Sequence, residues 1–113
     1  MILLDTSGLL SAIDGSQRRH AECVAALSRS SPPLLLSPFV LAELDCLLSQ
    51  HVGSDAQIAL LDEVARGAYQ LEPFAPADVA AAREVLKKYA NLRIGLADAS
   101  IVVLAERHRV REV

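Results

Sequence analysis

Short apolar runs and longer periodic stretches alternate along the chain. Residues 2–4 and 34–36 are apolar without interruption, which is typical of strands buried inside a parallel sheet. Residues 69–72 alternate between apolar and polar side chains and precede Pro73. Because proline is tolerated mainly at the edges of sheets, this third segment is predicted to be an edge strand.

The stretches between these strands carry apolar residues at helical spacing. Ser37 followed by Pro38 is a helix-start signal, with serine as N-cap and proline in the first turn. Residues 54–57 read as a capping box, and residues 14–16 are expected to break the chain between two helices. The predicted helices span residues 9–13, 17–28, 38–51, 54–67, 76–89 and 94–107.

Strands that alternate with helices predict a parallel sheet covered by helices on both faces. We therefore expect one α/β domain over residues 1–113, folded as a three-layer α/β/α sandwich with a central parallel sheet. Residues 110–113 resemble the opening of a further strand. The C-terminal strand is therefore expected to be truncated.

Composition narrows the possible partners and compartment. The net charge is −3, whereas a broad nucleic-acid surface usually carries a positive balance, so any contact with RNA is expected to be local. Cys23 and Cys46 lie far apart and are interpreted as reduced core residues without disulfide or zinc. No signal peptide or membrane-spanning run is found in the sequence, and we expect a cytoplasmic protein without membrane contact.

Three of the fourteen acidic residues have unusually apolar neighbours. Asp5 ends the first apolar run, while Glu43 and Asp98 are expected on apolar helix faces. Burying lone carboxylates is costly, so a shared cation or a shared water-filled cleft is the simplest explanation. Such a cleft would lie at the carboxyl ends of the strands. Asp5 also has a purely structural alternative, as a cap for turn N–H groups.

Carboxylates without histidine or cysteine suit Mg²⁺ or Mn²⁺ rather than zinc. Such an ion can activate water and stabilise the charge that develops when a phosphodiester is cleaved. The sequence therefore predicts an acidic metal site formed by Asp5, Glu43 and Asp98, each acting as a metal ligand and catalytic residue.

Three motifs resemble those of PIN-domain proteins, particularly VapC-type toxins of bacterial toxin–antitoxin pairs. They are MILLDTS at residues 1–7, SPFVLAEL at residues 37–44 and IGLADA at residues 94–99. The resemblance implies a Mg²⁺- or Mn²⁺-dependent endoribonuclease whose metal site contains Asp5, Glu43 and Asp98. It also implies that the Thr6 hydroxyl supports Asp5. Family members often carry a fourth acid, at a position that would lie beyond Val113.

The same resemblance implies three partners: an RNA substrate, a second copy of the chain in a homodimer, and a VapB-like antitoxin. The antitoxin's C-terminal segment would lie over the active-site groove, often with an arginine or lysine in the acidic pocket.

Basic residues are candidates for contact with RNA phosphates. Arg93 is the preferred one, because it precedes Asp98 by five residues. The cluster of Arg18, Arg19 and His20 is more simply explained as a solvated helix end, with phosphate contact as the alternative. Asp45 is interpreted as a surface residue.

Two alternatives to the nuclease stay open. The first is a catalytically inactive PIN-like module that binds RNA or an antitoxin. The second is a phosphoacceptor receiver domain, which is disfavoured because Asp5 is followed by Thr6 rather than by another acid.

Overall fold

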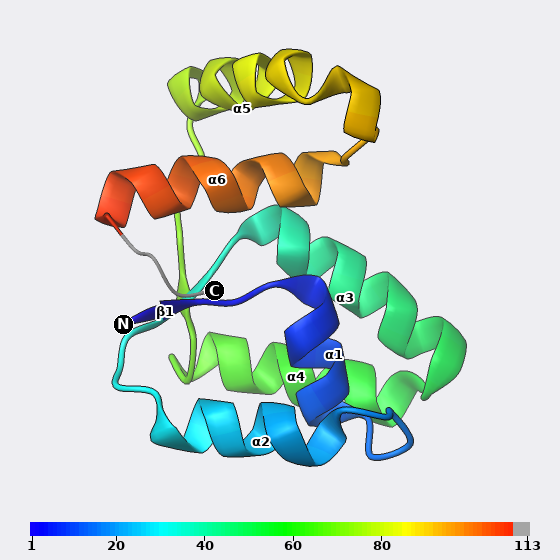
Figure 1. Ribbon diagram of the computed structural model, residues 1–113. Helices are drawn as coiled ribbons and strands as arrows, with labels where there is room; N and C mark the ends of the chain where they lie inside the picture. Colours follow the sequence, from blue (N-terminus) through cyan, green and yellow to red (C-terminus); the bar gives the residue numbers. More distant parts are fainter. Residues whose placement is uncertain (110–113) are drawn as a thin grey trace.

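The structure is a computed structural model that describes residues 1–109. Strands and helices alternate within this range (Figure 1). In chain order they are β1 (Ile2–Leu3), α1 (Thr6–Ile13), α2 (His20–Arg29), β2 (Leu34–Leu36), α3 (Pro38–His51), α4 (Ser54–Ala65), β3 (Gln70–Leu71), α5 (Pro76–Lys88), the short 3₁₀ helix η1 (Ala90–Leu92) and α6 (Leu96–His108).

The three strands form a parallel sheet in the order β1-β2-β3. In the register, Leu3 pairs with Leu35 and Leu36 pairs with Leu71. The predicted third strand therefore lies at an edge of the described sheet, next to β2. The predicted C-terminal strand at 110–113 lies outside the described residues.

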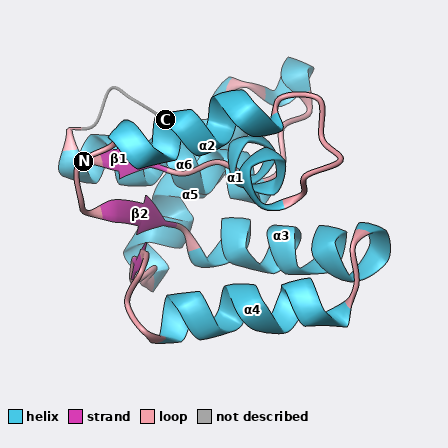
Figure 2. Ribbon diagram, turned by 90° about the horizontal axis from the view of Figure 1, so that it is seen from below, coloured by secondary structure: helices cyan, strands magenta, loops and turns pink. Residues whose placement is uncertain are grey.

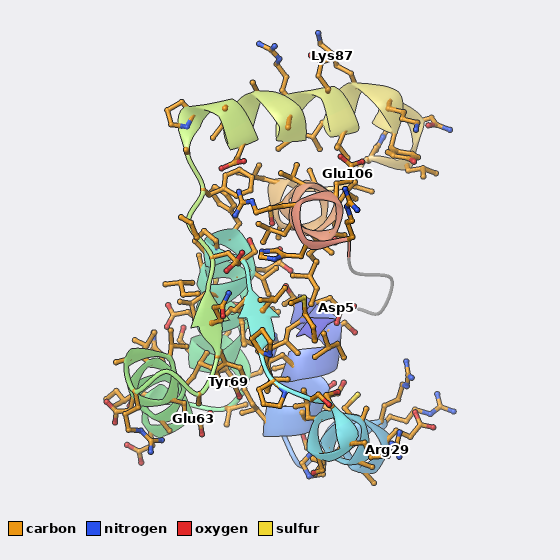
Figure 3. All side chains as sticks on the ribbon, turned by 90° about the vertical axis from the view of Figure 1, so that its left-hand side faces the viewer. Asp5, Arg29, Glu63, Tyr69, Lys87 and Glu106 are labelled. Atoms are coloured by element: carbon orange, nitrogen blue, oxygen red, sulfur yellow. The ribbon has the colours of Figure 1, made fainter. Side chains whose placement is uncertain are left out.

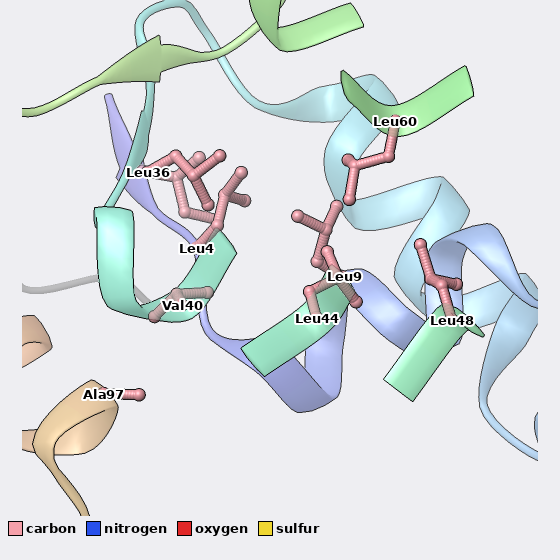
Figure 4. Close-up of a cluster of buried hydrophobic side chains, with 9 residues drawn as sticks. Leu4, Leu9, Leu36, Val40, Leu44, Leu48, Leu60 and Ala97 are labelled. Carbon is pink, nitrogen blue, oxygen red and sulfur yellow. The ribbon is translucent and has the colours of Figure 1, made fainter. Parts of the chain in front are cut away.

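Helices cover both faces of the sheet. Successive strand residues point to opposite faces, and Leu3 and Leu35 pack against Leu104 of α6. On the opposite face, Leu4 and Leu36 belong to a cluster that also contains side chains of α1, α3 and α4 (Figure 4). α5 packs on the outside of α6, while α3 and α4 lie along each other (Figures 1 and 2). The predicted α/β/α sandwich is confirmed.

Three helix starts differ from the prediction. α6 begins at Leu96 rather than at residue 94, and the other two differ because aspartates hold the turns next to them. α1 begins at Thr6 rather than at residue 9, since Asp5 Oδ1 accepts a hydrogen bond from the Gly8 N–H. α2 begins at His20 rather than at residue 17. There the buried Asp14 accepts hydrogen bonds from Ser16 and Gln17, which holds residues 14–17 in a turn.

The prediction for the cysteines was half right. Both are free, but Cys46 is exposed and Cys23 is only half-buried. The buried side of α3 is formed by Val40, Leu44 and Leu48 at four-residue spacing, and Cys46 lies off that line. No helix in the described part of the chain is long and apolar enough to cross a membrane.

Candidate active site at the carboxyl edge of the sheet

Asp5 lies where β1 leads into α1 (Figure 3). Its side chain is half-buried, and Oδ1 accepts the backbone N–H of Gly8 at 2.8 Å. The residue is therefore a true helix cap, as the structural alternative predicted. This role uses only Oδ1, so capping leaves Oδ2 free to bind a ligand.

Gly8 approaches Asp5 closely and was missed by sequence reasoning. A Cβ atom added to Gly8 would lie 2.7 Å from Asp5 Oδ1, which is shorter than a normal non-bonded contact. The carboxylate would have to move to admit any side chain. The absence of a side chain at residue 8 thus helps to set the Asp5 rotamer, and a glycine directly after a capping segment was the available signal.

Glu43 and Asp98 are exposed, and the expectation that they lie on buried faces was wrong. Consecutive helical residues are about 100° apart around the axis. Glu43 precedes the buried Leu44, and Asp98 follows the buried Ala97, so each is turned away from the core. The predicted location of Asp98 in the first turn of α6 is confirmed, where the helix dipole favours its negative charge.

A pair of buried serines joins the starts of α3 and α6. Ser37 caps α3, as predicted, by accepting the Phe39 and Val40 N–H groups. Its Oγ also lies 2.6 Å from Ser100 Oγ, and both side chains are fully buried. Because Ser100 Oγ donates to the Ala97 carbonyl oxygen, the Ser37 hydroxyl is the donor to Ser100. Ser100 was missed, although a serine inside an apolar helix signals a buried hydroxyl that needs a partner.

The serine pair holds together the starts of α3 and α6, the helices that carry Glu43 and Asp98. Ser37 directly follows β2, as Asp5 nearly follows β1, so both lie at the carboxyl edge of the parallel sheet. The hydrogen bond to Ser100 brings the first turn of α6, which carries Asp98, to the same edge. Figure 1 shows the starts of α1, α3 and α6 to the right of the strands, on the same side of the sheet. The starts of the helices that carry Glu43 and Asp98 thus lie at the same edge of the sheet as Asp5.

The carboxylates at this edge are not drawn together into a coordination sphere. Within residues 1–109, no three His, Cys, Asp or Glu side chains gather closely enough to hold a metal ion. Like charges at short range repel, and Glu43 and Asp98 are each solvated on their own helix. The arrangement provides carboxylate oxygens on three neighbouring elements.

The other candidate residues, Thr6, Arg93 and Asp45, differ in how far they are buried. Thr6 is buried at the start of α1, and among the described residues Asp5 is supported by the Gly8 N–H rather than by the Thr6 hydroxyl. Arg93 is exposed in the turn before α6, with a left-handed backbone (φ 51°). Asp45 is half-buried, and its Oδ1 is enclosed without a hydrogen-bond partner in the described structure, so its assignment as a surface residue was wrong.

A different carboxylate is buried near the opposite end of α6. Glu72 is only 5% exposed and hydrogen-bonds His108, while Arg107 lies 3.6 Å from its Oε1. Arg107 also pairs with Asp78 at 2.8 Å. Burial acts to raise the pKa of Glu72, but hydrogen bonds from Gln70 and His108 and the nearby positive charges outweigh it and lower the pKa. We call Glu72, Asp78, Arg107 and His108 the α6 clamp.

Comparison with known proteins is consistent with this geometry. The PIN domain family model matches residues 2–113. Ribonuclease VapC26 of Mycobacterium tuberculosis (strain ATCC 25618 / H37Rv) is 41% identical over 112 residues, covering 99% of this chain and 83% of the relative. The crystal structure of M. tuberculosis VapC20, described as a sarcin-ricin loop cleaving toxin, has a TM-score of 0.91 at 20% identity, covering 98% of this chain and 85% of that one. The structural likeness supports the fold, and the sequence matches decide the family: the chain belongs to the PIN domain family, as a VapC-type member.

Proposed function

We propose that Asp5, Glu43 and Asp98 hold a Mg²⁺ or Mn²⁺ ion with which this chain cleaves RNA phosphodiester bonds. The chain is a VapC-type endoribonuclease toxin, and the observation that carries this activity is its 41% identity to Ribonuclease VapC26 over nearly its whole length. The choice of ligands is supported by the starts of α1, α3 and α6, the elements that carry the three carboxylates, which lie at one edge of the sheet.

The donor atoms suit such an ion. All three side chains offer hard carboxylate oxygens, which Mg²⁺ and Mn²⁺ prefer over sulfur or imidazole ligands. Once bound, the ion would polarise the phosphate and lower the pKa of a water molecule. The chain's own contribution is positional: the Gly8 N–H orients Asp5, and the serine pair fixes the start of α6 relative to α3.

The substrate and partners follow from the VapC type. RNA contact is expected to be local, because the net charge is −3, and the exposed Arg93 is our candidate for a phosphate contact. A VapB-like antitoxin is the expected inhibitor, with a homodimer as the expected assembly and the cytoplasm as the expected compartment.

One observation favours the alternative of an inactive RNA- or antitoxin-binding module. This is the lack, within residues 1–109, of three ligating side chains close enough to hold a metal. The alternative predicts that the chain binds RNA without cleaving it at any metal concentration.

The decisive experiment incubates the purified chain with total cellular RNA in Mn²⁺ or Mg²⁺. Asp98→Asn keeps the shape of an exposed side chain, so we expect a folded protein without cleavage. Asp55→Asn is the matched control, because Asp55 is also an exposed acid in the first turn of a helix. Cleavage that persists in EDTA would exclude the metal mechanism, and RNA binding without cleavage would establish the inactive module.

A further inference from the structure

A groove starts at Asp5 and runs between β1, α1 and α2. Its polar lining consists of Asp5, Ser7, Ser11, Arg19, Glu22 and Cys23. Its volume is about 220 Å³, whereas a cavity of about 150 Å³ accommodates a benzene ring. The groove is therefore large enough for one heteroaromatic ring, and it opens beside a carboxylate of the proposed active site.

The floor and rim of the groove differ in chemistry. The floor is apolar and is formed by side chains of β1, α1 and α2, namely Ile2, Leu4, Leu9, Ala26 and Leu27. The rim carries Arg19, which is the one cationic residue among the described residues of the lining. A flat ring with polar edges, such as a nucleobase, matches an apolar floor beneath a polar rim.

Arg19 forms an exposed ion pair at the rim, which restrains its guanidinium group only weakly. Its Nε donates to Glu22 at 2.9 Å, although both side chains are largely exposed. The hydrogen bond and charge of Glu22 raise the pKa of Arg19, and Asp5 contributes a smaller effect of the same sign. Arg19 and Asp5 line the same groove. A planar guanidinium can stack on a base or pair with a phosphate.

We infer that this groove is a nucleobase subsite, which accepts one unpaired base of the RNA next to the scissile phosphate while Arg19 contacts that nucleotide. The inference rests on the proposed ribonuclease function and adds a base-binding site to it. A base can enter the groove only when it is unstacked and unpaired. Arg19 is a specificity residue in this account.

The first test measures base recognition without catalysis. Cys23 lines the groove, so its alkylation by iodoacetamide reports on occupancy. In EDTA, nucleoside 5′-monophosphates should slow this alkylation in a saturable way, and ribose 5-phosphate, which lacks a base, should not. Equal protection by both compounds would overturn the subsite. Because EDTA removes metal, the result does not depend on whether the chain cleaves RNA.

The second test compares neighbouring arginines. Arg19→Gln should raise KM for a single-stranded RNA about tenfold with little change in kcat, the size expected for the loss of one base-stacking or charged contact. Arg18→Gln removes the same charge from a residue outside the groove lining and should leave KM within about twofold of the wild-type value. Equal effects of the two substitutions would overturn the inference, and a wild-type chain that never cleaves would instead overturn the proposed function.

The third test fills the groove. Ala26 lines it and Ala25 does not, so Ala26→Phe should abolish protection of Cys23 by mononucleotides, whereas Ala25→Phe should preserve it. Thermal unfolding of both variants identifies any loss of fold. If folded Ala26→Phe retains the wild-type KM for RNA, the groove serves another occupant, such as a peptide, and the nucleobase subsite is refuted.

Discussion

The two ends of α6 use carboxylates in opposite ways. Near its C-terminal end, Glu72 is buried and contacts Gln70, Arg107 and His108. At its N-terminal end, Asp98 is exposed and, among residues 1–109, forms no ion pair. Removing one partner of a buried, compensated carboxylate destabilises the fold, because it leaves the other charge without compensation. An exposed carboxylate that lacks compensation contributes little to folding and is available for a ligand.

Asp5 combines the two uses of a carboxylate, because it caps α1 and is a proposed metal ligand. Substitutions there should therefore give the largest effect. Asp5→Asn keeps a capping oxygen for the Gly8 N–H, since asparagine and aspartate cap equally well. It removes the charge that would bind a metal, so RNA cleavage should fall by at least about 100-fold. Urea denaturation should show a nearly unchanged free energy of unfolding.

The Asp5→Ala variant is the companion to this experiment. It removes the cap as well, and should lower the free energy of unfolding by about 1 kcal/mol beyond Asp5→Asn. If Asp5→Asn cleaved RNA at the wild-type rate, Asp5 would be a cap alone.

A substitution in the α6 clamp should lower the stability of the fold and leave RNA cleavage nearly unchanged. Glu72→Gln leaves Arg107 and His108 without their buried charge partner. Because both are partly exposed, the expected loss in free energy of unfolding is about 1–3 kcal/mol. Cleavage per folded molecule, measured at a temperature where the variant remains folded, should stay close to that of the wild type. A large loss of activity without a loss of stability would contradict the division between the two ends.

Breaking the hydrogen bond between Ser37 and Ser100 should have a smaller effect, on both stability and RNA cleavage. Ser100→Ala leaves the buried Ser37 hydroxyl without its acceptor, at a cost of about 1 kcal/mol in stability. A modest fall in kcat should accompany it, because the start of α6 is no longer held to α3. A double-mutant cycle with Ser37→Ala measures the coupling, and additive effects would show that the two hydroxyls act independently.

The change of stability with pH should be the smallest of the expected effects. The pKa of Glu72 is lowered by hydrogen bonds and positive charges that outweigh burial, and hydrogen bonds from Ala75 and Arg107 lower that of Asp78. A lowered folded-state pKa gives stability that is present above the unfolded-state value and lost as pH falls through the folded-state value. Stability should therefore decline as the pH falls below the ordinary pKa values of 4.5 for the Glu72 carboxyl and 3.8 for the Asp78 carboxyl.

Urea denaturation across this acid range measures the decline. Glu72→Gln should flatten it, because one of the two titrating groups is gone. An equally steep decline in that variant would assign the acid sensitivity to other groups.

Sequence reasoning predicted the layers of the fold because continuous apolar runs and helical periodicity report burial directly. It identified Ser37 as a cap from its place before Pro38, and Asp98 as a first-turn residue. It did not predict which side of α6 faces solvent, because this helix packs against two other elements. α6 lies between the sheet and α5, so its apolar residues surround most of the helix and do not reveal that Asp98 faces solvent.

Polar contacts between residues that are far apart in the chain could also not be predicted from the sequence. Ser37 and Ser100 are separated by 63 positions, and Glu72 and His108 by 36. Nothing local marks such residues as partners, because only the packing of α6 brings them together. The shift of α1 to Thr6 was within reach, since Asp5 followed by Gly8 at the third position resembles a capped helix start.

The exposure of Glu43 and Asp98 has a genetic consequence. Substitutions at exposed helix positions rarely unfold a protein, so a single base change at either codon should yield a folded chain without nuclease activity. In a selection for cells that survive overproduction of the wild-type chain, survivors with normal levels of the protein should carry changes at these codons. Survivors altered at the Glu72 codon should instead be recognised by a reduced amount of the protein.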